Sequence, residues 1–364
     1  MSRIARATIR LDALHHNLGV ARQQVPNANA MAVLKADAYG HGLLPVAHEL
    51  AATTDGYAVS CLEEALPLRV AGLMHRIILL EGFFDAEEIP VFSARQLDAV
   101  IHQPWQIDAL AQADIPTPID CWLKVDTGMG RLGFSQDEAA DALARLKDLP
   151  TVGTIRWMTH LASADEPDNP MTDIQTERFG AIADGSHPAS LPNSAATLRG
   201  LEPHADWIRP GIMLYGASPF RDTSVHPPLQ PVMTLEAALI SVKQLPAGHG
   251  VGYGSRFACP EAMPVGVVSI GYGDGYPRHA PDGTPVMIAN RHCPLIGRVS
   301  MDMITVDLRN APQARAGDRA ILWGSRPRAT AVATACDTIS YELFCRLTPR
   351  VERVYRRGAN HGEG

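Results

Sequence analysis

Short apolar runs alternate with amphipathic stretches over about the first 220 residues. The stretches between the runs repeat apolar residues at helical spacing, as in 137–149, where Asp137 is the expected N-cap. Repeated strand–helix alternation predicts parallel strands joined by crossovers, and eight strands close an N-terminal (β/α)8 barrel of the TIM type. The alternative is an open doubly wound sheet, although no GxGxxG motif follows an early strand. The apolar runs predict strands at 31–35, 57–61, 76–82, 97–102, 120–126, 153–160, 188–193 and within 206–216.

The pattern changes after about residue 228, where short apolar runs are separated by Gly, Pro and Asn turns. This texture is typical of antiparallel sheet and predicts a C-terminal mainly-β domain with little helix before its end. The segment 219–231 reads as a linker. We therefore expect a barrel over 11–225 and a β-rich domain over 226–364.

Composition narrows the functional classes. The net charge of −7 and pI near 6.0 argue against a nucleic-acid partner or a polybasic membrane surface. Six cysteines show no metal-like spacing, so no metal site is expected. The stretch 1–14 has no apolar core of a secretory leader, and no apolar run is long enough to span a bilayer. A cytoplasmic protein that binds a small molecule is the expectation.

The first predicted strand ends on a lysine, Lys35, which is followed by the polar turn ADAYGHG. One interpretation is structural: the strand reaches water there, and the ammonium extends into solvent. The other is functional, because the carboxyl ends of barrel strands and the loops after them carry the chemistry of this fold. Neither interpretation can be chosen from Lys35 alone.

Polar residues recur at the ends of the other predicted strands. Each has a structural alternative: Lys124 and Asp126 can form an ion pair, and His160 can be a hydrogen-bonded structural residue. Together on one rim they predict an active site. The strand-end residues are Lys35, Lys124 and Asp126, Arg131 in the glycine-rich turn that follows, His160, Asn193 and Ser194, and Arg209 and Tyr215.

Two features indicate a phosphate ligand. Ser194 precedes AATLRGL and is the expected N-cap of a helix whose first amides are free to bind an anion. Gly211, in the step RPG, lets backbone N–H groups approach a ligand closely. A lysine in an apolar mouth has a lowered pKa, and its neutral amine can form a Schiff base with an aldehyde. Pyridoxal 5'-phosphate supplies both the aldehyde and the phosphate.

The segment VLKADAYGHG resembles the pyridoxal-phosphate attachment signature of alanine racemases. Further blocks resemble the same family in the same order, from about residue 31 to 350, so the resemblance covers nearly the whole chain. These blocks are VDTGMGRLGF, MTHLASAD, PNSAA, WIRPGIMLYG, VGYGSRF, IGYGDGYPR, GRVSMDM and ISYEL.

The resemblance implies a barrel followed by a β domain, with the N-terminal strand, residues 1–10, belonging to the β domain. It also implies a head-to-tail homodimer whose subunits share their active sites. Lys35 then holds the cofactor and acts as the base on one face, and Tyr253 of the partner subunit is the base on the other. A free tyrosine has a pKa of ~10, which is too high for an efficient base at neutral pH. His160 and Arg209 are expected to form a cationic hydrogen-bonded chain that favours the phenolate.

The remaining site residues are also implied by the resemblance. Arg209 lies at the pyridine nitrogen, where it cannot readily supply a proton. Lys124 matches a lysine that is often carbamylated in relatives. The cofactor contacts are Lys35, Tyr39, His160, Asn193, Ser194, Arg209, Gly211, Ile212 and Tyr341; the substrate contacts are Arg131 and Met301; the inner gate is Tyr272 and Tyr341; and the access corridor is Asp165, Arg278, Arg298 and Ile339.

The resemblance thus implies an isomerase that interconverts L- and D-alanine by two-base proton transfer at Cα of a pyridoxal-phosphate aldimine. Such an enzyme supplies D-alanine for cell-wall peptidoglycan or degrades it. A serine or broad-specificity racemase with the same two bases is the close alternative. A decarboxylase of basic amino acids is opposed by Arg209 and Tyr253. A non-catalytic protein that stores pyridoxal phosphate is opposed by the presence of the β domain.

Overall fold

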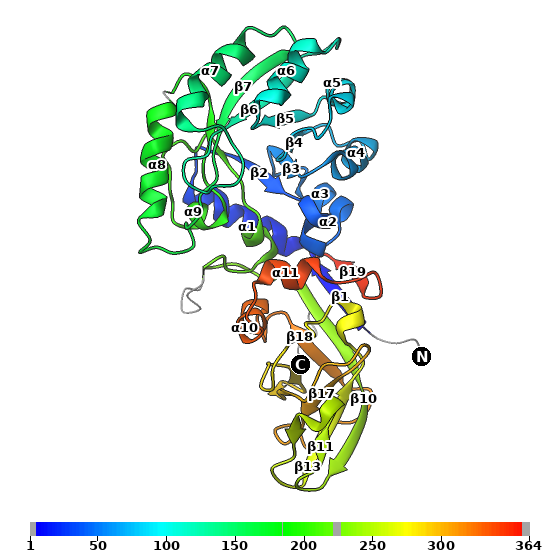
Figure 1. Cartoon of the computed structure of the whole chain (residues 1–364). Coiled ribbons are helices and arrows are strands. Elements are labelled where there is room, and N and C mark those ends of the chain that lie inside the picture. The colour runs from blue at the N-terminus through cyan, green and yellow to red at the C-terminus, as the bar shows by residue number, and fades with distance from the viewer. Residues whose placement is uncertain (1–4, 184, 221–226, 359–364) are drawn as a thin grey trace.

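The computed structural model describes residues 5–183, 185–220 and 227–358. Two bodies are visible: a barrel formed by the N-terminal half and an elongated β domain below it (Figure 1). The domain boundary expected between residues 225 and 226 lies outside the described ranges, and so does part of the expected linker. The exact boundaries therefore stay a prediction.

Eight parallel strands form the barrel, in the order β8-β7-β6-β5-β4-β3-β2-β9. Because β9 returns to pair with β2, the sheet curls round instead of staying open, so the barrel prediction is confirmed and the open-sheet alternative is wrong. Each predicted strand overlaps an observed one. The strands are β2 (Asn29–Val33), β3 (Gly56–Val59), β4 (Arg76–Leu79), β5 (Asp98–Ile101), β6 (Ile119–Lys124), β7 (Val152–Met158), β8 (Ala189–Ser190) and β9 (Trp207–Ile208).

Side chains complete the ring between its two short end strands. Ser190 Oγ donates to the carbonyl of Trp207 at 2.8 Å, and the Asp206 carboxylate accepts from the Ala189 N–H at the same distance. An isolated bridge joins Ser190 to Ala205. The barrel is therefore nearly closed although β8 and β9 are only two residues long.

Helices surround the barrel strands (Figure 1). The N-cap of the helix predicted over 137–149 is Ser135 and not the predicted Asp137, because the Ser135 hydroxyl and the Glu138 carboxylate form a reciprocal capping box. The elements are α1 (Leu11–Gln24), α2 (Lys35–Gly40), α3 (Leu43–Leu50), α4 (Leu62–Val70), η1 (Ala86–Glu88), α5 (Ile89–Arg95), α6 (Pro104–Gln112), α7 (Gln136–Lys147), α8 (Met171–Ile182), α9 (Ser194–Leu198) and η2 (Ile212–Tyr215).

The β domain is built on one long strand, β10 (Met233–Leu245), which pairs antiparallel with β1 (Ala5–Arg10), β13 and β18. Strand β1 also pairs with β19, so both ends of the described chain join this sheet. The other elements are β11 (Gly250–Val251), η3 (Tyr253–Ser255), β12 (Phe257–Ala258), β13 (Met263–Val268), η4 (Tyr272–Asp274), β14 (Met287–Ile288), β15 (Arg291–His292), β16 (Leu295–Ile296), β17 (Ile304–Asp307), β18 (Arg319–Trp323), α10 (Ala329–Ala335), α11 (Ser340–Cys345) and β19 (Glu352–Arg356).

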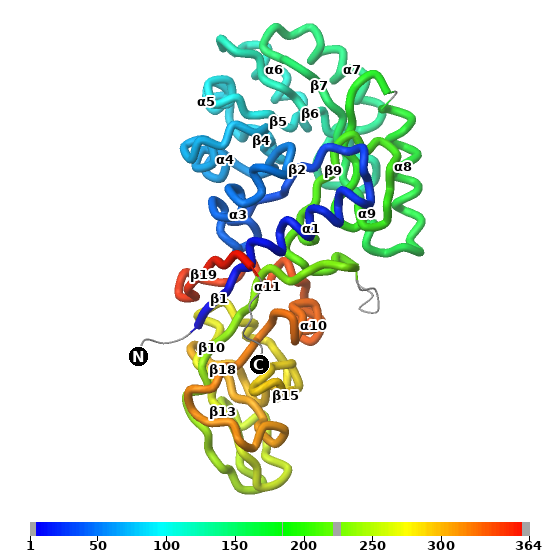
Figure 2. Tube along the Cα trace, turned by 180° about the vertical axis from the view of Figure 1, so that it is seen from behind, coloured from blue at the N-terminus to red at the C-terminus, as the bar shows by residue number. Residues whose placement is uncertain are grey.

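The two bodies meet where α11 packs against α2, the segment that starts with Lys35. Helix α1 leaves β1 at this junction and runs along the barrel, as the view from behind shows (Figure 2). One apolar cluster includes buried residues of both bodies, so the junction is continuous with the core. None of the helices in the described ranges has the length and apolarity needed to cross a membrane.

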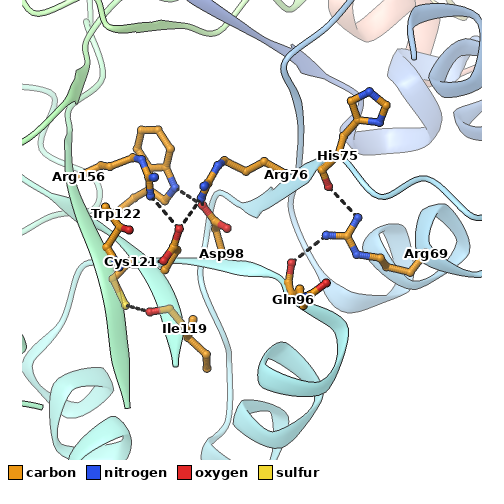
Figure 3. A network of polar contacts seen from close by, with 11 residues as sticks. Arg69, His75, Arg76, Gln96, Asp98, Ile119, Cys121, Trp122 and Arg156 are labelled. Carbon is orange, nitrogen blue, oxygen red and sulfur yellow. Dashed lines mark hydrogen bonds and ion pairs between the residues drawn. The ribbon is translucent and has the colours of Figure 1, made fainter. Parts of the chain in front are cut away.

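An ion network lies inside the barrel near the amino ends of its strands (Figure 3). Arg76 of β4 pairs with Asp98 of β5 and with Asp120 of β6, the latter at 2.9 Å. Arg156 of β7 pairs with Asp120 at 3.2 Å and lies over the ring of Trp122, whose Nε1–H donates to Asp98 at 2.8 Å. Burial raises the pKa of Asp98 despite the neighbouring Arg76. The network is at the end of the barrel that usually serves stability.

Candidate active site

Lys35 lies two residues after the end of β2, where the chain turns sharply. The next four residues, 36–39, all have left-handed backbone angles, with φ between 49° and 55°. Left-handed helical geometry costs an L-residue roughly 1–2 kcal/mol, because Cβ approaches the following carbonyl. Four consecutive non-glycine residues in this region are a strained feature. Strain of this kind persists only where the surroundings enforce it, and it clusters at functional sites.

The turn ends at Gly40, where the structure requires glycine. Its φ is +73°, and a Cβ there would lie 2.2 Å from the Phe344 carbonyl oxygen of α11. Arg353 of β19 donates from Nε to the Gly40 carbonyl at 2.8 Å. The turn that begins at Lys35 is therefore held from the β domain as well as from the barrel.

Lys124 ends β6 on the face that points into the barrel. Residues two apart on a strand share a face, so Lys124 lies above Trp122 and Asp120 of the ion network. Burial lowers the pKa of Lys124 to about 8, and the positive charges of Arg209, Arg131 and Lys35 add to the shift. Within the described residues no carboxylate lies at ion-pair distance from this ammonium.

Asp126 does not pair with Lys124, so the ion-pair interpretation is wrong. Its carboxylate accepts the backbone N–H groups of Gly128, Met129, Gly130 and Arg131, at 2.9 to 3.2 Å. Burial works against ionisation, but these four donors outweigh it and lower the pKa of Asp126. Asp126 therefore shapes the turn that presents the exposed Arg131. Arg131, Lys124 and His160 line one small pocket.

Arg209 follows β9 and is buried, with 5% of its surface exposed. Its guanidinium donates to the Thr159 carbonyl at 2.7 Å, to the Ser190 carbonyl at 2.8 Å and to Nδ1 of His160 at 3.4 Å. Burial and the Arg209 charge lower the pKa of His160 well below its usual value. His160 is therefore neutral, and the positive charge of the expected chain resides on Arg209 alone. With Nδ1 accepting, Nε2 carries the proton and is a donor.

Tyr39, Ser194 and Gly211 meet at the same mouth. Ser194 Oγ accepts the Gly211 N–H at 2.8 Å, and a Cβ on Gly211 would lie 2.9 Å from the Tyr39 hydroxyl. The prediction that Ser194 is the N-cap of α9 is wrong. The N-cap is Asn193, whose side chain accepts the Ala196 N–H at 3.1 Å. Ser194 and Ile212 are instead the first residues of α9 and η2.

Helix α11 brings Tyr341 to this cluster. The Tyr341 ring contacts the edge of Tyr39, with centroids 5.7 Å apart. Burial raises the pKa of the Tyr341 hydroxyl, and the nearby Asp165 charge raises it further. Ile339, the exposed N-cap residue of α11, lies two positions before Tyr341. Residues predicted for the gate and corridor thus come from both bodies of the chain.

Five predicted site residues lie in the β domain, away from this cluster. Tyr253 is in η3, with 68% of its surface exposed, and Met301 lies between β16 and β17, with 53% exposed. Tyr272 begins η4, and its ring faces the Arg278 guanidinium at 5.9 Å. Arg278 and Arg298 are also exposed. A single chain therefore does not bring these residues to the mouth around Lys35.

The sequence reasoning missed three residues at the rim. Glu81 and His102 follow β4 and β5, and each interacts electrostatically with Lys124. His102 is the last residue of its predicted strand and Glu81 the last but one of its own, so their position was a usable signal. Glu64 of α4 accepts the Ala36 N–H at 2.7 Å and the Ser60 N–H at 2.8 Å. An acidic residue in the first turn of a helix is ordinary, and no pattern linked it to Lys35.

Fold and site define the chain as a two-domain barrel protein: a (β/α)8 barrel carries a cationic, hydroxyl-lined mouth, and an antiparallel β domain follows. Family models described as the N-terminal and C-terminal domains of alanine racemase match residues 9–219 and 232–355. The chain belongs to the alanine racemase family.

Individual relatives match along their whole length. An alanine racemase of Halorhodospira halophila is 52% identical over 97% of this chain and 98% of its own length. An alanine racemase of Xylella fastidiosa is 49% identical over 97% of each chain. The crystal structure of the biosynthetic alanine racemase of Pseudomonas aeruginosa is similar with a TM-score of 0.94 and 44% identity, covering 98% of this chain and 100% of that one.

Proposed function

We propose that this chain is a pyridoxal-phosphate-dependent alanine racemase, interconverting L- and D-alanine to supply D-alanine for peptidoglycan or to degrade it. The observation that carries the proposal is that Lys35 opens a strained turn at a mouth whose far side holds Arg209 locked against His160. A lysine at the start of a strained turn, and an arginine whose guanidinium is held by several hydrogen bonds, are typical of a functional site and not of a solvated surface.

The residues at the mouth fit pyridoxal phosphate. Lys35, Lys124, Arg131 and Arg209 carry positive charge there, which favours an anionic ligand. The Tyr39 and Ser194 hydroxyls and the Ile212 N–H are donors suited to a phosphate. The Gly211 N–H donates to Ser194 Oγ and holds that hydroxyl in place, and we assign Gly211, Asn193 and Tyr341 to the same cradle. We place Arg209 at the pyridine nitrogen and His160 beside it. When bound, the cofactor stabilises the electron pair left at Cα after the proton is removed.

Two side chains exchange protons with Cα. Racemisation needs a base on each face of the carbon, one removing the proton and the other returning one. We assign Lys35 Nζ to one face and the hydroxyl of Tyr253, from a second copy of the chain, to the other. Neutral His160 can donate from Nε2 toward that tyrosine, and Arg209 supplies the positive charge that favours its phenolate. Arginine keeps its proton, so Arg209 does not protonate the pyridine nitrogen.

The exposure of the β-domain residues supports the homodimer that we propose. Tyr253, Tyr272 and Met301 are exposed on the β domain, and a second copy in head-to-tail orientation would bring them to a barrel mouth. Domain limits of 1–10, 11–225 and 226–364 belong to the same proposal, with the first strand part of the β domain.

Substrate selection is assigned to the residues that surround the mouth in the dimer. Arg131 and Met301 bind the carboxylate of the amino acid, and Tyr272 and Tyr341 form a narrow gate that favours alanine over bulkier substrates. Asp165, Arg278, Arg298 and Ile339 line the corridor outside the gate. Lys124 is still mostly protonated at neutral pH, but its pKa of about 8 gives it a far larger neutral fraction than an ordinary lysine has. That neutral amine is suited to carbamylation, and the resulting anion would orient Arg131.

The test is incubation of L-alanine with cofactor-loaded protein in D2O, followed by chiral chromatography and mass analysis. D-alanine carrying deuterium at Cα is the expected product, and Lys35→Ala is expected to form none. The same assay with L-serine measures substrate breadth. Decarboxylated product, or no deuterium at Cα of either enantiomer with the cofactor bound to Lys35, would overturn the proposal.

A further inference from the structure

Lys35 and Tyr39 are four residues apart, at the start and end of the left-handed turn. One turn of a helix of either hand returns the chain to the same side, so both side chains are presented to one ligand. The Tyr39 hydroxyl reaches the backbone at Gly211, in the cradle assigned to the phosphate. The handedness of 36–39 therefore sets the spacing between the amine and a phosphate donor.

Glu64 holds the start of this turn from a different element. Its two carboxylate oxygens accept separate backbone N–H groups, Oε1 from Ala36 at 2.7 Å and Oε2 from Ser60 at 2.8 Å. Ser60 directly follows β3, so the carboxylate ties the first left-handed residue to the neighbouring barrel strand. A carboxylate can accept both bonds, whereas an amide can accept at only one of its two terminal atoms.

Contacts within the segment secure its far end. The Asp37 carboxylate accepts the Leu43 N–H at 2.7 Å. His41 is buried, and its Nδ1 lies 2.8 Å from the Tyr39 carbonyl and 3.1 Å from that of Ala38. These contacts hold the segment together at its far end, but none of them involves Ala36. Ala36 is the first residue that must adopt the left-handed conformation.

We propose that Glu64 is a positioning residue for Lys35 and Tyr39: its carboxylate clamps the left-handed turn, so that amine and hydroxyl engage one phosphorylated aldehyde together. The inference rests on the proposed function, since it concerns how that site takes its cofactor. Glu64 acts through the backbone and does not touch the reacting atoms.

The test compares Glu64→Gln with Glu63→Gln in the full-length protein. Glutamine places an amide NH2 against one of the two N–H donors, so one half of the clamp is lost. Glu63 is its exposed neighbour in the same first helical turn and is the matched control. The probes are pyridoxal phosphate and pyridoxal, which carry the same aldehyde with and without the phosphate. Binding is measured by absorbance, and the adduct is trapped with borohydride and mapped by peptide mass analysis.

The clamp predicts a specific loss in Glu64→Gln. The preference for pyridoxal phosphate over pyridoxal is expected to fall by about tenfold, because Tyr39 no longer shares the ligand with Lys35. Equal weakening of both aldehydes, or no change in either, would overturn the proposal, since a merely destabilised site does not discriminate between them. Glu63→Gln is expected to keep the wild-type preference.

Amide hydrogen exchange tests the clamp without any cofactor. Peptides covering 35–43 are expected to exchange about tenfold faster in Glu64→Gln than in wild type or Glu63→Gln. Unchanged exchange there would refute the clamp. If wild type forms no adduct at Lys35, the proposed function fails while this readout still decides the role of Glu64. Should Glu64→Gln not fold, Glu64→Asp, which keeps the carboxylate but shortens its reach, takes its place in both measurements.

Discussion

The Arg209 guanidinium donates to Nδ1 of His160 across 3.4 Å while two backbone carbonyls, of Thr159 and Ser190, hold the same group in place. This relationship fixes the tautomer of the imidazole, because an Nδ1 that accepts leaves the proton on Nε2. Burial next to a permanent cation also keeps His160 neutral, as the lowered pKa indicates. The pair therefore offers a fixed charge and an oriented donor at one edge of the mouth.

Replacing Arg209 by lysine is expected to impair both stability and catalysis. The planar guanidinium donates hydrogen bonds to two carbonyls and an imidazole at once, and the single ammonium of lysine cannot reproduce this arrangement. We expect the free energy of unfolding to fall by about 2–4 kcal/mol, as buried charge-assisted bonds are lost. We expect kcat to fall by about a hundredfold or more. Denaturant unfolding and the deuterium assay measure the two effects.

Arg145→Lys is the control for Arg209→Lys, because Arg145 pairs with Asp108 at the surface and exposed pairs contribute about 0–1 kcal/mol. A catalytic rate at the wild-type level in Arg209→Lys would contradict the role assigned to the guanidinium.

Two inactive variants are expected to restore activity when they are mixed. In a head-to-tail dimer, Lys35→Ala and Tyr253→Phe chains combine into hybrids that contain one intact site each. Random exchange of equal amounts then yields about a quarter of wild-type activity. The mixture is assayed after unfolding and refolding together, with each variant refolded alone as the control. No recovery in a mixture shown to contain hybrids would refute the sharing of sites between subunits.

Tyr253→Phe alone should affect the two directions unequally. Abstraction from L-alanine is expected to slow far more than deuterium exchange at Cα of D-alanine, since Lys35 still serves its own face. The two rates are followed separately by mass analysis in D2O. Equal losses in the two rates would contradict the assignment of one base to each face.

Much of the barrel was predictable because its strands are buried on both faces and read as short apolar runs between amphipathic helices. Even β8, two residues long, lies within the predicted stretch 188–193. The same logic placed Lys35, Lys124, His160 and Arg209 on one rim, since carboxyl ends of parallel strands converge there. The Tyr253 assignment could come only from family resemblance, because its exposed position carries no such signal.

The left-handed turn could not be predicted from its residues. Ala36 and Ala38 have strong right-handed helical preference, so the local sequence KADAY argues for the opposite geometry. The conformation is imposed by tertiary contacts, including Glu64 from α4 and Phe344 from α11. Neither contact leaves a periodic pattern, since each joins segments that are distant in the sequence.

Removing the buried acid Asp98 is expected to destabilise the barrel without changing its chemistry. In Asp98→Asn the Arg76 guanidinium keeps Asp120 but loses its buried charged partner, and the loss of such a charge-assisted hydrogen bond costs about 1.5–3 kcal/mol. The network lies at the amino ends of the strands, away from Lys35, so kcat at low temperature should stay within about twofold of wild type. Thermal unfolding and the deuterium assay test the two halves. Asp108→Asn, at a surface pair, is the matched control, and equal losses in both variants would contradict the burial argument.

Replacing Lys124 by methionine is expected to stabilise the protein near neutral pH. The folded pKa of about 8 lies below the ordinary 10.5, so between these values the unfolded chain binds the extra proton. Wild-type stability should therefore rise with pH from about 8 to 10.5 relative to Lys124→Met. At pH 7 the variant should be more stable by about 1–3 kcal/mol, allowing for partial relief by solvent, and above pH 10.5 the two should converge.

The comparison is made by denaturant unfolding in buffer free of carbon dioxide, with the exposed Lys147→Met as the control. Adding bicarbonate near pH 8 should then stabilise wild type but not Lys124→Met, because only a neutral buried amine is available for carbamylation. If the difference between wild type and Lys124→Met does not depend on pH, the lowered pKa is wrong. If bicarbonate stabilises both proteins equally, Lys124 is not the group that reacts with it.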